Sequence, residues 1–242
     1  MTKVRLDQKL VQLGLAPSRT KAEGMIMAGQ VKVGDKMVDK AGYFVDDDAQ
    51  ISVAAPPPYV SRGGEKLASV AEKLRLNFKD KIVLDVGSST GGFTDYALQN
   101  GAKKVIAVDV GTGQLDWRLR NDERVVVMER TDIRDVDSLP DPIEILLIDV
   151  SFISLRLVLP SVARLSGPNT QIIAMAKPHF EADYKTASMH KGVIKNETIR
   201  RAILKNVELF IKQKFVIKAK ADSEVTGRKG NRERFYLLKK TT

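Results

Sequence analysis

The sequence predicts a mostly parallel α/β domain that follows a small α+β domain, and three observations support this fold class. After residue 80, short apolar runs with strand character alternate with helical patterns. Such alternation is typical of parallel sheets covered by helices on both faces. The first 54 residues instead show two short helical patterns followed by hairpin-like runs. A run of three prolines separates the two patterns and favours an extended spacer.

The N-terminal domain is expected to span residues 1–54. Apolar residues recur at helical spacing over residues 6–14 and again over residues 17–29, and each pattern ends at a glycine. Two valine-rich runs flank a Gly-Asp turn in residues 31–38, which predicts a hairpin, and residues 51–53 predict a further strand. This part of the chain is therefore expected to be a self-contained α+β unit.

Residues 55–60 form the predicted linker, and residues 61–242 form the larger domain. Its clearest helical patterns cover residues 92–100 and 196–214, whereas residues 183–192 show no clear element and are expected to form a mobile loop. The connection between the last two strands is short, so one of them is expected to run antiparallel to the rest. The expected strands span residues 82–86, 105–108, 124–128, 145–148, 171–174, 215–219 and 235–238.

Composition excludes several function classes. The net charge of +10 and the sequence pI of about 9.6 favour a polyanionic partner such as nucleic acid, although a solvated basic surface is the simpler alternative. The chain has no cysteine and only His179 and His190, so we expect neither disulfides nor a zinc site. Neither a membrane-spanning run nor a secretory leader is expected, which favours a cytoplasmic protein.

The stretch VLDVGSSTGGFTD, residues 83–95, places a glycine-rich turn after the first expected strand of the larger domain. In open α/β sheets, ligands bind at the carboxyl ends of the strands. The spacing of Gly87 and Gly92 is that of a P-loop, but Phe93 stands where the phosphate-binding lysine belongs. Ser89 occupies the second glycine position of the dinucleotide fingerprint. The loop therefore favours a ligand without phosphates.

Carboxylates lie at the ends of three successive strands. Asp85 directly precedes the glycine turn, Asp109 ends the second strand, and Asp132 follows the third. A ring of acids suits a ligand with ribose hydroxyls and positive charge, and S-adenosylmethionine (AdoMet) has both. Each aspartate taken alone could instead cap a helix or turn. Ser88 and Ser89 either bond the cofactor or only shape the turn.

Four further polar residues lie near expected strand ends. Asp149 and Lys177 end apolar strands, and removal from water favours the uncharged form of such a lysine. Lys66 opens the helix before the first strand, and Glu233 begins a late strand. Each of the four alone could be an ordinary surface charge. Their shared position near strand ends, where ligands bind in such sheets, is what indicates a functional site.

The N-terminal segment RLDQKLVQLGLAPSRTKAEGMIMAGQVKVGDKMVDKAG resembles an S4 domain, a small RNA-binding module. The match extends over most of the segment. It implies that the two-helix face binds structured RNA and that Arg5, Arg19 and Lys21 contact phosphates. Each of these cations could instead be solvated or form a local ion pair.

A second resemblance covers nearly the whole chain. SRGGEKL, LDVGSSTGGFTDYAL, AVDVGTGQLDWRLRND, DVSFISL and AMAKPHFEA are similar to segments of the TlyA family of ribosomal-RNA 2′-O-methyltransferases, often labelled hemolysin A. Family members join an S4 domain to a Rossmann-like, FtsJ-like methyltransferase domain with a mostly parallel seven-stranded sheet. The resemblance implies AdoMet-dependent methylation of ribose, on cytidine, in ribosomal RNA of ribosomal subunits. The residues that match its cofactor-binding segments are Gly87, Ser88, Gly91, Gly92, Phe93 and Asp109.

The resemblance also implies a catalytic set of Lys66, Asp149, Lys177 and Glu233. A ribose 2′-hydroxyl is a weak acid, so its attack on a methyl group is helped by a base, and we expect Lys177 to fill that role. A non-catalytic RNA-binding or ribosome-assembly factor is the main alternative function. A cytolysin is a remote one, because no secretion signal or spanning segment is evident.

Overall fold

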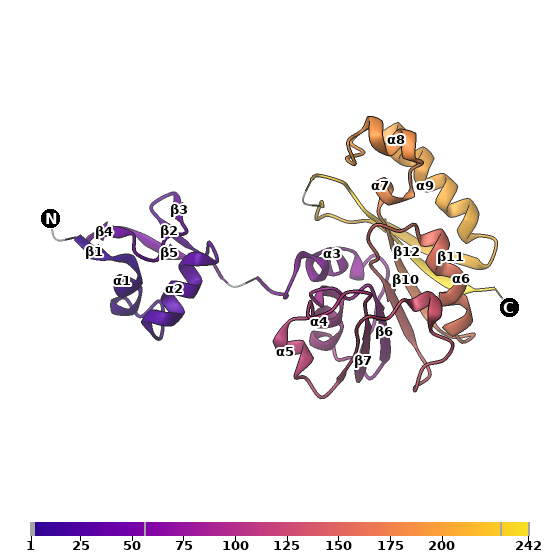
Figure 1. Ribbon diagram of the computed structural model, residues 1–242, viewed down its shortest axis with the longest axis horizontal. Helices are drawn as coiled ribbons and strands as arrows, with labels where there is room; N and C mark the ends of the chain where they lie inside the picture. The colour runs from indigo at the N-terminus through magenta and orange to yellow at the C-terminus, as the bar shows by residue number, and fades with distance from the viewer. Residues whose placement is uncertain (1–2, 56, 228, 242) are drawn as a thin grey trace. The chain divides into compact units, whose positions relative to one another are not determined.

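The computed structural model describes residues 3–55, 57–227 and 229–241, so Pro56 of the predicted linker lies outside the described residues. Contacts divide the chain into two compact units, Met1–Pro57 and Pro58–Thr242 (Figure 1). Each unit has a hydrophobic core of its own. The linker boundaries at residues 55 and 60 stay a prediction.

The smaller unit packs two helices, α1 (Leu6–Gln12) and α2 (Arg19–Met27), with two small sheets. Its core includes Leu6, Leu10 and Ile26, all fully buried. The predicted hairpin is confirmed, because Val31 pairs with Val38. The three-stranded sheet contains β2 (Val31–Val33), β3 (Lys36–Val38) and β5 (Ile51–Val53). The two-stranded sheet contains β1 (Lys3–Arg5) and β4 (Phe44–Asp46). The sequence did not predict these last two strands.

The larger unit contains a seven-stranded sheet among its described residues, in the order β11-β12-β10-β9-β6-β7-β8. The neighbours β10-β9-β6-β7-β8 pair in parallel, and β12 is antiparallel to both β10 and β11. The mostly parallel α/β prediction and the expected antiparallel strand are therefore confirmed. The strands are β6 (Ile82–Val86), β7 (Lys104–Val108), β8 (Val125–Met128), β9 (Ile145–Ile148), β10 (Gln171–Ala176), β11 (Phe215–Asp222) and β12 (Arg234–Lys240).

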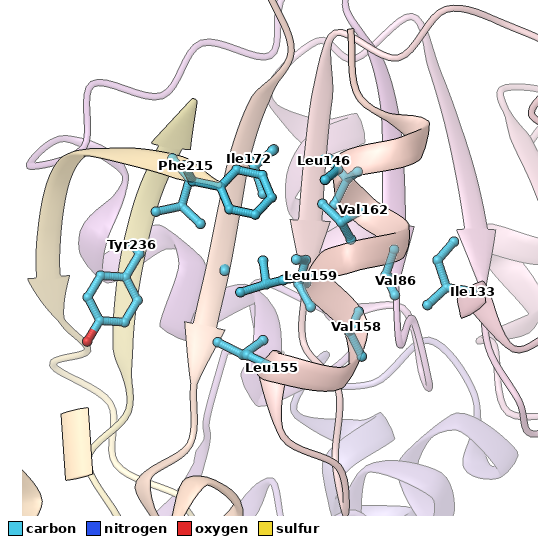
Figure 2. Packing of buried hydrophobic residues seen from close by; sticks show 14 of the residues in the cluster. Val86, Ile133, Leu146, Leu155, Val158, Leu159, Val162, Ile172, Phe215 and Tyr236 are labelled. Carbon is cyan, nitrogen blue, oxygen red and sulfur yellow. The ribbon is translucent and has the colours of Figure 1, made fainter. Parts of the chain in front are cut away.

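Helices cover both faces of this sheet (Figure 1). One face packs against α6 (Leu155–Leu165) and α9 (Glu197–Ile211), through apolar residues such as Leu159 and Val207. Figure 2 shows the α6 side chains directed at strand residues, among them Leu146 and Ile172. Removing such surface from water stabilises the fold by roughly 25 cal/mol per Å².

The opposite face packs against α3 (Arg62–Ala71), α4 (Gly92–Gln99) and the short α5 (Trp117–Arg120). We call it the α3 face. Side chains alternate between the two faces along each strand, as period-2 geometry requires. In β9, for example, Ile145 and Leu147 lie on the α3 face, whereas Leu146 and Ile148 lie on the other.

One expectation for the larger unit is wrong. Residues 183–192 are not a loop without structure, because they contain the short helix α8 (Tyr184–Met189). Asp183 caps this helix by accepting hydrogen bonds from Thr186 N and Thr186 Oγ1. The cap explains why a polar segment without apolar periodicity forms a helical turn.

Candidate active site

The alternation of side chains brings four polar residues to one corner of the α3 face. Asp149 follows β9, Lys177 follows β10, and Glu233 precedes β12. Because β12 is antiparallel, its start lies at the same edge as the ends of the parallel strands, and the register that pairs Ala176 with Arg234 places Lys177 and Glu233 side by side. Lys66 reaches this corner from α3.

Two ion pairs join these four residues. Lys66 Nζ lies 3.0 Å from Glu233 Oε1, and Lys177 Nζ lies 2.6 Å from Asp149 Oδ1. Lys177 Nζ also donates a hydrogen bond to Ser151 Oγ at 2.7 Å. The two lysine side chains are only 12% and 11% exposed, and that of Glu233 is 2% exposed. The predicted set is thus brought together in space, and water screens its charges weakly.

The charged atoms of this group are not all paired. Glu233 Oε2 is buried and has no hydrogen-bond partner among the described residues. Burial raises the pKa of Asp149, and the charges of Lys177 and Lys66 oppose that rise. Burial together with the two lysines lowers the pKa of His179 to about 4, so this imidazole is uncharged at neutral pH. His179 therefore adds no positive charge to the site.

A cavity of about 140 Å³ opens beside the ion pairs. Asp85 lines it together with both lysines, Asp149 and residues of the glycine turn. Asp85 is fully buried: its Oδ2 accepts a 2.7 Å hydrogen bond from Thr94 Oγ1, and its Oδ1 has no partner among the described residues. Burial raises the pKa of Asp85 to about 7. An unpartnered buried carboxyl oxygen in a cavity is suited to accept a hydrogen bond from a ligand.

A second cavity, of about 300 Å³, adjoins the first and shares Gly87, Ser89, Asp149 and Ser151 with it. It lies at the carboxyl ends of β6, β7 and β9, the usual ligand position in such sheets. Asp109 and Asp132 line it, as do Gln114 and apolar residues. The apolar lining comprises Val86, Val108, Val110, Ile133, Val150, Phe152, Ile153 and Val158.

The two aspartates of the larger cavity already have protein partners. Asp109 accepts hydrogen bonds from Ser89 N at 2.8 Å and from Gly111 N at 2.7 Å, so it fixes the glycine turn. Asp132 caps the 3₁₀ turn η1 (Ile133–Asp135) by accepting from Arg134 N, and the Arg134 side chain lowers its pKa. A carboxylate has about four acceptor sites, so both residues can still accept from ligand hydroxyls.

The glycines of the turn have distinct structural roles. Gly87 and Gly91 adopt φ values of +82° and +97°, which side chains disfavour. A Cβ at Gly87 would lie 2.8 Å from the Asp149 carbonyl oxygen, so this glycine lets the turn after β6 approach the segment that follows β9. A Cβ at Gly91 would collide with the side chains of Leu119, in α5, and of Leu115, just before it.

Gly92 and Phe93 start α4 and mainly serve packing, although both line the smaller cavity. A Cβ at Gly92 would collide with Ser61 Oγ and lie 2.8 Å from Gly64 N, so Gly92 allows α3 and α4 to touch. Phe93 is 3% exposed and packs against Phe235, with ring centroids 5.9 Å apart. Ser88 is buried in the turn. The Ser89 hydroxyl donates a hydrogen bond to Gln114 Oε1 at 3.0 Å.

In the smaller unit, two of the three expected RNA contacts form ion pairs. Arg5 Nη2 and Arg19 Nε lie 2.8 and 2.9 Å from Asp7 Oδ2, and Asp7 is fully buried. The hydrogen bond from Arg5 is the main cause that holds the pKa of Asp7 well below its usual range. The side chains of Arg5 and Arg19 remain 34% and 51% exposed, and Lys21 is exposed. Arg19 also pairs with Glu23, with Nε 3.4 Å from Oε1, so two carboxylates balance the two guanidinium groups, and Lys21 is the cation of the three without such an ion pair among the described residues.

Sequence reasoning missed Ser151, Gln114 and His179. Ser151 and Gln114 contact residues from other strand ends, which only the fold brings near. His179 was seen only as a possible metal ligand.

In the part of the chain that the structure describes, no group of three or more histidines and acids could hold a metal. Within the same residues, no helix is long and apolar enough to span a bilayer.

Comparisons with known proteins identify the families of both units. The FtsJ-like methyltransferase model matches residues 59–240, and the S4 domain model matches residues 4–51. YqxC of Bacillus subtilis, a candidate rRNA methyltransferase, is 46% identical over 98% of this chain and 85% of its own length. The 16S/23S rRNA (cytidine-2′-O)-methyltransferase TlyA of Mycobacterium tuberculosis is 39% identical over 74% of this chain and 68% of its own.

A solved structure supports the same relationship. A candidate hemolysin from Streptococcus thermophilus matches with a TM-score of 0.74 at 38% identity, over 100% of this chain and 90% of that one. The family resemblance noted from the sequence motifs is thereby confirmed. The chain belongs to the FtsJ-like methyltransferases, in the TlyA or hemolysin A family that joins an S4 domain to a methyltransferase domain.

Proposed function

We propose that this protein transfers a methyl group from AdoMet to a ribose 2′-hydroxyl of ribosomal RNA, on a cytidine, in ribosomal subunits. The observation that carries the proposal is the pair of ion pairs, Lys66–Glu233 and Lys177–Asp149, at the edge of a cavity shared with the glycine turn. The cytidine specificity rests on the name of the Mycobacterium tuberculosis relative.

The residues of the two cavities fit AdoMet. Asp109 and Asp132 offer free acceptor positions to ribose hydroxyls, and the apolar lining of the larger cavity suits an adenine ring. Asp85, with its unpartnered Oδ1 in the smaller cavity, suits an amino group. Phe93 in place of a phosphate-binding lysine agrees with a ligand that has no phosphate. When bound, AdoMet supplies an electrophilic methyl group on a sulfonium centre.

Lys177 is the proposed proton acceptor. Its amine lies in the smaller cavity, held by Asp149 and Ser151, and can reach a hydroxyl placed there. With Lys177 in its uncharged amine form, Nζ can accept the 2′-hydroxyl proton as the oxygen takes the methyl carbon, and the carbon–sulfur bond of the sulfonium would break with its electron pair left on sulfur. Asp149 fixes the direction of the Lys177 side chain, which is how a carboxylate contributes to alignment.

Lys66 lines the smaller cavity, and Glu233 holds it there through their ion pair. Lys66 can donate a hydrogen bond to the 2′-oxygen or to a neighbouring phosphate, because an ammonium group has three donors and Glu233 uses one. Glu233 keeps Lys66 in place from a nearly fully buried position. The S4 unit supplies affinity for folded RNA through cations such as Arg5, Arg19 and Lys21.

The decisive experiment separates the base role from charge alone. Purified protein and labelled AdoMet are added to ribosomal subunits that lack the modification, and label on ribose 2′-oxygens is measured. Lys177→Ala should abolish transfer, and Lys177→Arg should also fail, because a guanidinium keeps the charge and the Asp149 pair but does not accept a proton. Full transfer by Lys177→Arg would refute the base role. A non-catalytic assembly factor would leave even the wild-type reaction without label.

A further inference from the structure

Glu181 connects the two chain segments that hold Lys177 and Asp149. It ends α7 (Pro178–Glu181), the turn that begins directly after Lys177, and it is only 6% exposed. Its Oε2 accepts a hydrogen bond from Ser154 Oγ at 2.6 Å, and its Oε1 accepts from Leu155 N at 2.7 Å. Both partners lie at the start of α6, on the segment that begins at Asp149.

The two segments are therefore joined at both ends. At one end, Lys177 contacts Asp149 and Ser151. Between the ends, the rings of Phe152 and Phe180 lie with centroids 5.2 Å apart. At the far end, Glu181 joins the two segments through its hydrogen bonds from Ser154 and Leu155. A displacement of either segment would change the distance between the lysine amine and the aspartate.

The turn that links Lys177 to Glu181 is short and rigid. The Lys177 carbonyl accepts hydrogen bonds from Phe180 N at 2.9 Å and from Glu181 N at 3.3 Å. Pro178 is buried at the first helical position, where its ring fixes φ. Because the turn moves as one piece, anchoring Glu181 also anchors the backbone of Lys177.

The burial of this carboxylate is energetically costly. Burial raises the pKa of Glu181, and the hydrogen bonds from Ser154 and Leu155 oppose the rise. The N-terminus of the eleven-residue α6 favours a negative charge here as well. If packing alone mattered, an apolar residue of similar volume would stabilise the site at least as well. Two directed hydrogen bonds to one helix start instead fix a position.

We propose that Glu181 is a positioning residue for methyl transfer, which holds the Lys177 turn against the start of α6 and so sets the Lys177–Asp149 geometry. This inference rests on the proposed function and adds to it a residue outside the four catalytic positions. Glu181 is not among the described residues that line either cavity, so it acts through Lys177.

The test compares Glu181→Ala with a matched control, Glu144→Ala. Glu144 also bonds one side chain and one backbone amide, Lys81 Nζ and Ile82 N, but at the opposite edge of the sheet. Four quantities are measured on the full chain: AdoMet affinity by calorimetry, the single-turnover rate on ribosomal subunits, the melting temperature, and deuterium uptake in residues 177–183.

Glu181→Ala should lower the single-turnover rate about 100-fold, the cost of roughly 1 Å of misplacement, without changing AdoMet affinity. Deuterium uptake in residues 177–183 should rise in this variant and not in Glu144→Ala. Glu181→Gln keeps the side-chain length and an acceptor for Leu155 N, so it should restore the rate to within about tenfold of wild type. If Glu181→Ala does not fold, Glu181→Asp, which shortens the reach by one methylene, replaces it with the same expected rate loss.

Two results would overturn the positioning role while leaving the proposed function intact. One is a folded Glu181→Ala, or the replacement Glu181→Asp, that transfers methyl groups at the wild-type rate. The other is an equal rate loss in Glu144→Ala, which would indicate general destabilisation. A wild-type protein that transfers no methyl group would instead overturn the proposed function, and the positioning role with it.

Discussion

Replacing Gly92 by alanine tests how the fold brings Lys66 to the site. Gly92 begins α4 and lies against the start of α3, the helix that holds Lys66. The added Cβ would collide with Ser61 Oγ and would lie 2.8 Å from Gly64 N and 3.0 Å from Gly63 Cα. Two of these three atoms are backbone, so rotation of a side chain cannot relieve the contact. The helices must move apart.

The size of the effect follows from overpacking. Inserting a methyl group into a well-packed site costs about 1 to 3 kcal/mol. For a unit of this size, each kcal/mol corresponds to roughly 2 to 4 °C, so the melting temperature should fall by roughly 2 to 12 °C. A shift of α3 would also move Lys66 relative to Glu233, and misplacement of this kind lowers the rate by about 10- to 100-fold.

The assay is calorimetric unfolding of the full chain, following the transition of the larger unit, together with single-turnover methyl transfer. Gly167→Ala is the control, because its new Cβ would meet only Thr170 Oγ1, at an ordinary 3.7 Å, among the described residues. That variant should match wild type in both measurements. If Gly92→Ala unfolds at the wild-type temperature and reacts at the wild-type rate, the close approach of α3 and α4 is not what positions Lys66.

Three further predictions concern charged groups. Because the pKa of Asp85 rises from 3.8 to about 7 on folding, the free energy of unfolding should fall as pH rises from about 4 to 7 and then level off. In denaturant titrations, Asp85→Asn should remove this decrease, which amounts to at most about 4 kcal/mol, and the variant should also bind AdoMet more weakly. Lys66→Met leaves Glu233 buried without its partner and should cost about 3 to 5 kcal/mol at pH 7, a loss that Lys66→Met/Glu233→Gln should partly restore in the same titrations. The lowered pKa of Asp7 implies stability that is present above about pH 4 and lost as pH falls below it, so Asp7→Asn should flatten the acid limb of unfolding followed by NMR signals of the smaller unit.

Much of the fold could be predicted because its strands are strongly apolar. The runs at Ile82–Val86 and Ile145–Ile148 are strands with the predicted bounds, since nearly every residue in them is buried on one face or the other. The strands β1 and β4 were missed because they pair with each other from distant parts of the smaller unit, without the tight turn that marked β2 and β3. Helix α8 was missed because a side-chain cap, rather than an apolar stripe, determines it.

The site was only partly predictable for a different reason. Asp149, Lys177 and Glu233 could be placed at strand ends from the sequence, but their common face depends on the register between β10 and β12. Glu181 gave no signal, because its partners Ser154 and Leu155 lie 27 and 26 residues away along the chain. Gly92 matched a cofactor-loop pattern, and only the packing of α3 shows what its missing side chain permits.

The central claim is that the Lys66–Glu233 and Lys177–Asp149 corner methylates ribose 2′-hydroxyls of ribosomal RNA. The most direct measurement incubates the purified protein with labelled AdoMet and unmodified ribosomal subunits and locates the label by nuclease digestion and mass spectrometry. The expected result is a methyl group on the 2′-oxygen of a cytidine, which Lys177→Ala and Asp149→Asn fail to add. Label on a base atom, or no label with AdoMet bound, would contradict the claim.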